Sequence, residues 1–513
     1  MVGEECGVCA CVLKKNNFNI LPQILYILLN ELQHRGQTSS GLAVYSHDSR
    51  KRLKSCSEVG KVNNLFRSYD KAFFNNFFLN NSGNSGIGHV RYATSNVNDD
   101  MLSVLEEAQP FLRRHGRPWK KFAIAFNGHI TNYNSLKDDL IKEGYYLDTD
   151  VDTEVLMHLI SLSLKNNWND SIDFPNGIFK VFREVIKNLD GSFSFVFLNG
   201  QGDMIIVRDK YGFRPLVIGE NENMICVASE SKALIKVGME KFRDVYPGEI
   251  ILIRDGKIYS FIEGCSCSKA YCHFEYVYFS DACSVNNGII VDEVRGSLGK
   301  ILAREEKIKF NNPSEWVVVP VPSTGIPIAV AYAQNSKLPL SFALIKSDVG
   351  RGFINSSFQR KIIMDSKYNI VPRSVLGKKV ILIDDSIVRG ETSSRVIELL
   401  RIFGAKEVHL RVGEMPIKYP CCYGVDFPSF EELILGNFKG TKEEAEKIVA
   451  QKIHADSVGF VSFDGLKESL GGKNNFCFAC LNGDYPTKAG CGFLEGKLKK
   501  LKERNNNDCI VED

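Results

Sequence analysis

The sequence has no run of about 18 consecutive apolar residues, the length that a membrane-spanning helix requires. Its opening segment, MVGEECGVCACVL, carries acidic charge, whereas a secretory signal begins with basic residues. Neither charge sign is in excess, because 64 basic residues stand against 61 acidic ones. We therefore expect a cytoplasmic protein with no global field for nucleic acid or a membrane surface, so that any anionic ligand must be bound locally.

A regular cysteine framework is also absent. The 15 cysteines are spaced irregularly along 513 residues, which indicates reduced thiols, a few of them with catalytic, metal or cluster roles, rather than a set of disulfides. The length exceeds what one hydrophobic core supports and indicates two or three domains.

The first half of the chain has the pattern of apolar residues that is typical of an antiparallel fold. Between Cys6 and about Arg254, short runs rich in Val, Ile and Phe alternate with helical patterns, as in FAIAFNGHI (122–130) and SFSFVFLNG (192–200). Several runs end in Gly or Asn-Gly and follow one another closely. This pattern predicts antiparallel strands with helices packed outside.

The pattern of apolar residues changes from about Val294. The strands EWVVVPVP (315–322) and KKVILIDD (378–385) are nearly continuous apolar runs, separated by predicted helices such as 325–334 and 392–404. Such runs predict a parallel sheet buried on both faces.

Three further segments have simpler readings. The stretch 262–279 lies between the two patterns and is the expected crossover. The charged tail after Leu494 is expected to be a frayed or solvated end. Asn-rich clusters at 75–76, 80–81 and 505–507 are expected to be loops.

Cys6 follows only five residues, MVGEE, that contribute nothing to a core. A thiol needs a base to become a nucleophile, and a free α-amino group on the same residue, with a pKa of about 7.7 to 8.0, can serve. That chemistry would require removal of residues 1–5.

Four segments supply partners for such a thiol. Together with Cys6 they resemble, in order and spacing, the N-terminal-nucleophile glutamine amidotransferases, whose glutaminase fold is an α+β, four-layer αββα sandwich. The resemblance implies such a domain over residues 6–262. The segments are LQHRGQTSSG (32–41), GIGHVRYAT (86–94), AFNGHI (125–130) and DVDTEV (150–155), and RDKYGFRPL (208–216) and ASES (228–231) extend the match.

The resemblance implies a role for each of five residues. Cys6 would attack the glutamine amide, while Asn127 and the backbone N–H of Gly128 form the oxyanion hole. Arg91 and Asp152 would bind the α-carboxylate and the α-amino group. The alternatives are a turn at Asn127-Gly128, a surface ion pair for Arg91 and a helix cap for Asp152.

KKVILIDDSIVRGETSS (378–394) reads as a buried strand, a small polar loop and a helix start. Two carboxylates at the end of a parallel strand suit ribose hydroxyls, and the backbone of the loop suits a phosphate, although an Asp-Asp pair can also be a plain turn. The segment resembles the phosphoribosyl diphosphate signature of type I phosphoribosyltransferases, which implies an α/β domain over 263–470. The implied donor-binding residues are Asp384, Asp385, Ser386, Arg389, Gly390 and Thr392.

A second loop, VPVPSTGIP (319–327), would by the same resemblance hold the diphosphate through Gly325, and Mg²⁺ through Thr324 together with Asp384 and Asp385. The family usually has an acidic residue where this chain has Ser323. Lys346 begins a third loop of the donor site, but the Ser347-Asp348 that follow make it one residue shorter than the family's pattern and put its closure over the donor in doubt.

CFAC (477–480) is a Cys-x-x-Cys pair that could be redox-active, zinc-binding or accidental. Cys272 and Cys421 lie where the cluster-bearing subgroup of glutamine phosphoribosyl diphosphate amidotransferases has its other two ligands. The resemblance thus implies a structural, oxygen-sensitive 4Fe-4S cluster on Cys272, Cys421, Cys477 and Cys480. Zinc would accept the same four thiolates, and Cys422 could replace Cys421.

From Cys6 to about Lys488 the chain resembles the amidophosphoribosyltransferase family, with residues 471–513 as a C-terminal segment. The resemblance implies that glutamine, water and phosphoribosyl diphosphate give phosphoribosylamine, glutamate and diphosphate, the first step of purine biosynthesis. It also implies a homotetramer, inhibition by purine nucleotides, and self-cleavage before Cys6.

Two other classes of function fit parts of the sequence. The glutaminase half alone would fit asparagine synthetase or a hexosamine-forming transferase, but neither uses the IDDSIVRG loop (383–390). A catalytically impaired, nucleotide-binding regulator descended from the same family is an alternative that Ser323 and the short loop favour. Glutamate release stimulated by phosphoribosyl diphosphate discriminates between them.

Overall fold

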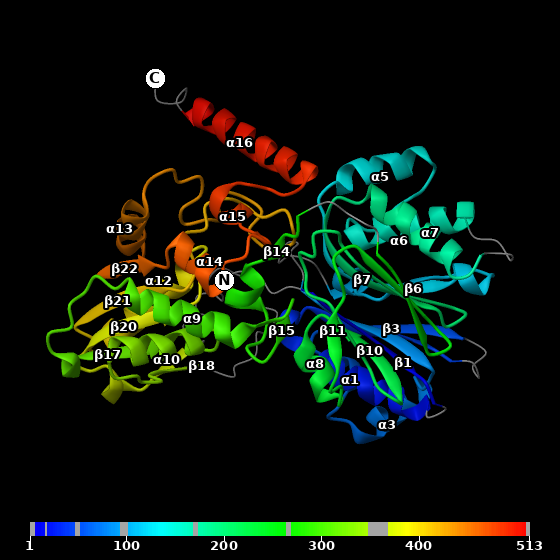
Figure 1. The fold of residues 1–513 in the computed structure, drawn as a ribbon, viewed down its shortest axis with the longest axis horizontal. Coiled ribbons are helices and arrows are strands. Elements are labelled where there is room, and N and C mark those ends of the chain that lie inside the picture. Colours follow the sequence, from blue (N-terminus) through cyan, green and yellow to red (C-terminus); the bar gives the residue numbers. More distant parts are fainter. Residues whose placement is uncertain are drawn as a thin grey trace.

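The computed structural model describes residues 6–15, 18–46, 52–92, 101–167, 173–262, 268–346 and 368–508. Figure 1 shows two layered bodies, an antiparallel sandwich from the first half of the chain and a parallel sheet with flanking helices from the second. In these ranges no helix is long and apolar enough to span a bilayer.

The first body is a sandwich of two antiparallel sheets, with strand orders β11-β9-β10-β1-β4-β2-β3 and β13-β12-β8-β7-β6-β5. The strands of the first sheet are β1 (Gly7–Leu13), β2 (Ser39–Tyr45), β3 (Leu53–Val59), β4 (Ser85–Arg91), β9 (Val217–Glu220), β10 (Met224–Ala228) and β11 (Phe242–Asp244). Those of the second are β5 (Phe111–Arg113), β6 (Phe122–Ile130), β7 (Gly191–Asn199), β8 (Met204–Arg208), β12 (Glu249–Arg254) and β13 (Lys257–Ile262).

Alternation along β1 explains the layers of this body. Val8 and Ala10 pack in the core between the sheets, whereas Cys9 and Cys11 face the helices on the outside. The outer helices beside the first sheet are α1 (Leu21–Glu31), α2 (Val62–Phe66), α3 (Lys71–Asn80), α4 (Met101–Glu106) and α8 (Ser231–Lys236), and those beside the second are α5 (Tyr133–Lys142), α6 (Asp152–Asn167) and α7 (Asn176–Asn188). The predicted αββα sandwich is confirmed.

The second body is a parallel sheet of order β17-β20-β21-β22. Val318 and Ile381 belong to the core under one set of helices, and their neighbours Val319 and Leu382 to the core under the other, so both faces are buried as predicted. The elements are β17 (Trp316–Pro320), β20 (Lys379–Asp384), β21 (Glu407–Val412), β22 (Ser457–Phe460), α9 (Val291–Arg304), α10 (Gly325–Ser336), α12 (Glu391–Ile402), α13 (Lys442–Ile453) and α14 (Phe463–Ser469).

Small elements join the two bodies. The predicted crossover contains β14 (Tyr271–Cys272), which pairs in parallel with β23 (Phe476–Cys477) near the C-terminus, and a π-helix, η4 (Glu275–Phe279). The remaining elements are β15 (Val285–Asn286), β16 (Ile289–Ile290), β18 (Leu344–Lys346), β19 (Tyr368–Ile370), α15 (Ala479–Asn482) and α16 (Lys488–Asp508).

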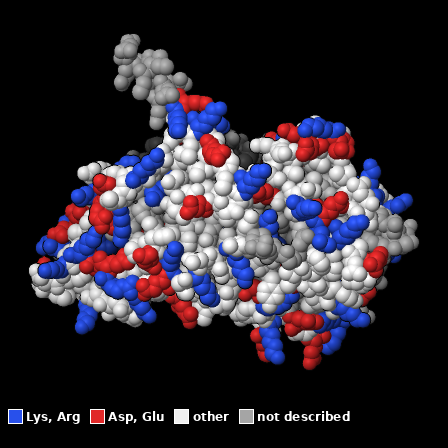
Figure 2. All heavy atoms as spheres, turned by 45° about the horizontal axis from the view of Figure 1, so that its top comes forward, with Lys and Arg blue, Asp and Glu red and all other residues white. Residues whose placement is uncertain are grey.

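Two local predictions were wrong. Of the Asn clusters predicted as loops, Asn75, Asn76 and Asn80 lie inside α3 and residues 505–507 inside α16. In α3 the Asp70 carboxylate caps the helix, and Phe74 and Phe78 pack one of its faces. The tail after Leu494 belongs to α16, whose run of Leu, Lys and Glu favours a helix. The helix projects away from the body in Figure 1, and Figure 2 shows charged side chains at the base of the projection, so the predicted solvation of this segment is confirmed.

Candidate functional site

Cys6 lies directly ahead of β1, the middle strand of the first sheet. Its thiol contacts the carbonyl oxygen of Tyr92 at 3.8 Å, and its own carbonyl accepts a hydrogen bond from Nε of Arg35 at 3.1 Å. Burial raises the pKa of the Cys6 thiol, and the Tyr92 contact and the charge of Arg91 offset only part of that rise. The thiol is therefore protonated at neutral pH and needs a base before it can attack.

Arg91 and Asp152 lie near this thiol. Arg91 ends β4 and is 6% exposed; its Nη2 donates to Glu107, and its buried Nη1 has no hydrogen-bond partner among the described residues. Asp152 opens α6, and its Oδ2 accepts from the backbone N–H of Ile130 at 3.0 Å. Burial raises the pKa of Asp152. The Arg91 ion pair is thus buried rather than superficial, and one guanidinium nitrogen remains for a ligand.

Asn127 and Gly128 lie within β6, paired with Ser194 and Phe193 of β7, and do not form a turn. The Nδ2 of Asn127 is buried without a hydrogen-bond partner in the described structure. Gly128 has φ +150°, and a Cβ at this position would lie 2.0 Å from the carbonyl oxygen of Ser192. Only glycine fits there, and an unpaired amide donor stands beside it.

The predicted donor residues line one cavity of about 390 Å³ at the carboxyl end of the parallel sheet. Asp384 and Asp385 end β20 and are 7% and 4% exposed. The Asp385 carboxylate accepts hydrogen bonds from Ser386 Oγ at 2.6 Å and from the Thr324 hydroxyl. Paired carboxylates and a hydroxyl therefore converge on the cavity.

The loop after β20 leads into α12, where Gly390 precedes the first helical residue with φ +83°. The hydroxyl oxygen of Thr392, in the first turn, is buried without a hydrogen-bond partner among the described residues. Arg389 also lines the cavity, and its guanidinium pairs with Glu432. A helix N-terminus with an unpaired hydroxyl is suited to phosphate oxygens.

The remaining predicted donor residues do not all line the cavity. Lys346, at the end of β18, lines the cavity, as do Ser323 and Thr324. Gly325 begins α10 and is not among the lining residues. The predicted short loop with Ser347 and Asp348 lies outside the described residues.

The four predicted cluster cysteines line a single enclosed cavity of about 20 Å³. Its wall also contains Phe213, Phe274, Tyr423, Phe427 and Tyr485, and Cys422 does not belong to it. Cys272 and Cys477 are register partners in the β14–β23 pair. Burial raises the pKa of Cys272 to about 12, against the opposing charge of Arg214. We call this cavity, with its four cysteines Cys272, Cys421, Cys477 and Cys480, the thiol chamber.

Within the described ranges, no three His, Cys, Asp or Glu side chains have the geometry of a preformed metal-ion site. The thiol chamber nevertheless fits a thiolate-ligated cluster in its donor set, because four cysteine thiols from three segments meet behind aromatic rings. Arg214, 1% exposed, lies where it can balance the negative charge of bound thiolates.

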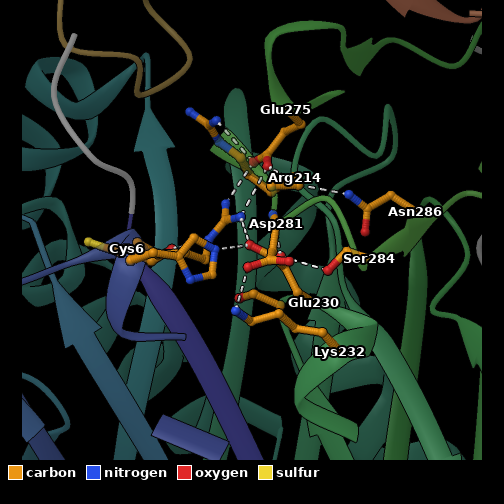
Figure 3. A network of polar contacts seen from close by, with 12 residues as sticks. Cys6, Arg214, Glu230, Lys232, Glu275, Asp281, Ser284 and Asn286 are labelled. Atoms are coloured by element: carbon orange, nitrogen blue, oxygen red, sulfur yellow. Dashed lines mark hydrogen bonds and ion pairs between the residues drawn. The ribbon is translucent and has the colours of Figure 1, made fainter. Parts of the chain in front are cut away.

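A buried polar network that no sequence pattern predicted includes Glu230, Glu275 and Arg214 (Figure 3), and Arg35 joins the two glutamates. Arg35 donates from Nη1 to Glu230 at 2.7 Å and from Nη2 to Glu275 at 2.7 Å. Arg214 lies 3.6 Å from Glu275 and also donates to the carbonyl of Tyr423. This network, the junction network, thus connects the backbone of Cys6 with the crossover and with the wall of the thiol chamber.

A half-buried thiol ahead of the middle strand of an αββα sandwich, and paired acids at the end of a parallel strand, define a glutamine amidotransferase domain joined to a phosphoribosyltransferase domain. A family model described as glutamine amidotransferase domain matches residues 99–236, and one described as phosphoribosyl transferase domain matches residues 286–412. The chain belongs to the amidophosphoribosyltransferase family, as the following relatives show.

Amidophosphoribosyltransferase of Archaeoglobus fulgidus is 37% identical over 472 residues, 91% of this chain and 95% of the relative. The Bacillus subtilis enzyme is 35% identical over 499 residues, 95% of each. The solved glutamine phosphoribosylpyrophosphate amidotransferase of B. subtilis, complexed with ADP and GMP, is similar with a TM-score of 0.79 and 34% identity, covering 94% of this chain and 98% of that one. The predicted family and fold are confirmed.

Proposed function

We propose that this chain releases ammonia from glutamine at Cys6 and transfers it to phosphoribosyl diphosphate, giving 5-phosphoribosylamine, glutamate and diphosphate, the first step of purine biosynthesis. The observation that carries the proposal is the pairing of two sites in one chain: a half-buried thiol with two unpaired donors nearby, and an acid-lined cavity at a helix N-terminus. The family relationship supports the same reaction.

In the glutamine site, Cys6 attacks the amide carbon. Once residues 1–5 are removed, its own α-amino group accepts the thiol proton. Asn127 Nδ2 and the Gly128 N–H stabilise the oxyanion, since that Nδ2 has no other partner in the described structure. Arg91 Nη1 binds the α-carboxylate, and Asp152 binds the α-amino group.

In the donor site, Asp384 and Asp385 hold the ribose hydroxyls, while the loop from Ser386 to Thr392 holds the 5-phosphate. Arg389 and Lys346 add positive charge, and the loop at Thr324 and Gly325 holds the diphosphate. Mg²⁺ bound by Thr324, Asp384 and Asp385 would neutralise the leaving diphosphate. The hydrogen bond between Thr324 and Asp385 supports this assignment because it brings the oxygen ligands together.

The thiol chamber binds a 4Fe-4S cluster in this proposal, with zinc as the competing occupant. Its residues tie the crossover to the C-terminal segment, so the cluster's contribution is structural. We assign residues 6–262 to the glutaminase domain, 263–470 to the transferase domain and 471–513 to the C-terminal segment. A cytoplasmic homotetramer that purine nucleotides inhibit completes the proposal; the B. subtilis relative was solved with ADP and GMP.

The test measures glutamate release and diphosphate release by anaerobically purified protein, with and without phosphoribosyl diphosphate, together with intact mass and iron content. We expect the loss of MVGEE, about four iron atoms per chain, and glutamate release that the donor stimulates. A processed, iron-replete sample that binds nucleotides but releases no glutamate would favour the impaired regulator instead. Zinc in place of iron would overturn the cluster assignment alone.

A further inference from the structure

His34 belongs to the amidotransferase half of the chain but lines the donor cavity. It follows α1, its side chain is 31% exposed, and the other residues that line this cavity all follow position 277. Its neighbour in sequence, Arg35, touches the carbonyl of Cys6. Residues 34 and 35 therefore connect the two sites, because Arg35 contacts the backbone of the nucleophile and His34 reaches the donor cavity.

The imidazole of His34 is held by a buried carboxylate. His34 Nε2 lies 2.7 Å from Glu230 Oε1, and Glu230 is fully buried. The second oxygen of Glu230 accepts from the Asp281 N–H at 2.9 Å and from Ser284 Oγ at 2.7 Å (Figure 3). Nε2 is taken up by the buried acid, while the side chain is 31% exposed and lines the cavity, so Nδ1 is the ring nitrogen that remains for a ligand.

Glu230 stays ionised. Burial alone would raise the pKa of Glu230, but His34 and Arg35 hold it well below its usual range. An ionised carboxylate at Nε2 fixes the proton on that nitrogen and leaves Nδ1 as the acceptor. It also stabilises the imidazolium that forms if Nδ1 takes up a proton.

The transfer reaction needs such an acceptor. As ammonia forms the C1–N bond, the C1–O bond to diphosphate breaks and its electron pair leaves with the diphosphate. The nitrogen then carries one proton too many, and the amine product forms only when that proton is removed.

We propose that Nδ1 of His34 accepts this proton, with Glu230 as its positioning partner; the inference rests on the transfer reaction proposed above. The His34 imidazole becomes imidazolium, the amino group of phosphoribosylamine is left uncharged, and the imidazolium later passes the proton to water. Since the acceptor comes from the half that produces ammonia, the donor cavity is complete only when the two halves are joined.

Other charged groups near the cavity are less suited to this task. Asp281 pairs with Lys232 at 2.7 Å, and although burial opposes it, that pairing lowers the pKa of Asp281. Lys232 also lies 3.7 Å from Glu31. The remaining charged groups around the ring and the cavity are Arg35, Arg295, Lys346, Asp384, Asp385, Arg389 and Glu391. The two aspartates among them are assigned to ribose and Mg²⁺, and the cations cannot accept a proton. Glu391 is an exposed carboxylate in the first turn of α12, and a carboxylate is a weaker base than an imidazole.

The test uses the full-length, processed enzyme with ammonium salts as nitrogen source, so that the glutamine site plays no part. At each pH the concentration of uncharged ammonia is kept constant. We expect His34→Gln, which keeps a donor near Glu230, to lower kcat about 10²-fold. The KM for phosphoribosyl diphosphate should stay within about threefold. If the imidazole is the acceptor, the wild type should lose rate when acid protonates it, and the variant should not show this loss.

Added imidazoles provide a second measurement. They should restore the rate of His34→Ala in proportion to their basicity, which a merely structural role does not predict. His115→Gln, which changes an exposed histidine in the sandwich, is the matched control. An unchanged pH profile together with a raised KM alone would overturn the inference, and if His34→Ala fails to fold, the pH profile of His34→Gln decides. A wild type inactive with ammonia would instead refute the transfer reaction itself.

Discussion

The two proposed sites are assembled in different ways. In the sandwich, the glutamine-site residues come from separate elements spread over positions 6 to 152, and they meet only because two sheets pack together. In the parallel body, most donor residues lie within 384–392, a single strand-to-helix connection. The first site depends on tertiary packing of the sandwich, whereas the second is largely a property of one loop on a buried strand.

Because of this difference, we expect a substitution in one site to leave the reaction of the other site unchanged. Each has its own strands, its own core and its own unpaired donors, and the junction network connects them at a few residues. The following changes test whether damage on one side stays there.

The largest effect is expected from Cys6→Ala. Removal of the nucleophile should lower glutamate release by about 10⁴-fold or more, while diphosphate release with ammonium stays within about twofold of the wild type. Both rates are measured on the same preparation. Cys283→Ala, which changes an exposed thiol, is the control. A parallel loss of the ammonia reaction would mean that the sites are not separable.

Asn127→Ala should lower the kcat of glutamate release by about 10²- to 10³-fold, because one oxyanion donor is lost while the thiol remains. The KM for glutamine should change little, and the ammonia reaction should not change. Asn223→Ala, at an exposed loop, provides the comparison. A change confined to KM would assign Asn127 to ground-state binding instead.

Asp384→Asn tests the donor site in the same way. The change removes a charge that the ribose hydroxyls and Mg²⁺ both use, so synthesis should fall by about 10²-fold with glutamine and with ammonium alike. Asp464→Asn, on an exposed part of α14, should leave both rates as they are. If only the glutamine-dependent rate fell, the donor assignment would be wrong.

Thr392→Val should have the smallest effect. Its buried hydroxyl has no partner among the described residues, and its loss should raise the KM for phosphoribosyl diphosphate by about tenfold with little change in kcat. Thr392→Ser, which keeps the hydroxyl, should behave as the wild type. Equal defects in both variants would point to packing rather than to phosphate binding.

The contrast between the sites also explains what the sequence could predict. Asp384 and its loop form a contiguous pattern with a physical meaning, and the two sheet types followed from the patterns of apolar residues. The loop prediction for Asn75 and Asn76 was wrong because it rested on composition alone. The Asp70 cap and the packing of the phenylalanines of α3 stabilise a helix there.

Arg35, Glu230 and Glu275 escaped notice for a different reason. Their contacts join residues 195 and 240 positions apart, and no local spacing pairs them. The segments that contain Arg35 and Glu230 stood out as motifs, but only the packed structure shows that these residues touch. The same holds for His34, whose role depends on a cavity built from the other half.

The pairing of β14 with β23 has a consequence for how the protein is made. The thiol chamber joins Cys272 to cysteines roughly 200 residues later in the chain, so a ribosome needs about 10 to 40 s to supply the last of them after the first. During that interval the sandwich can already fold. If the chamber binds a cluster as proposed, metal delivery would fall at the end of translation, and a chain truncated before Cys480 would leave the ribosome with an incomplete, oxidisable set of thiols.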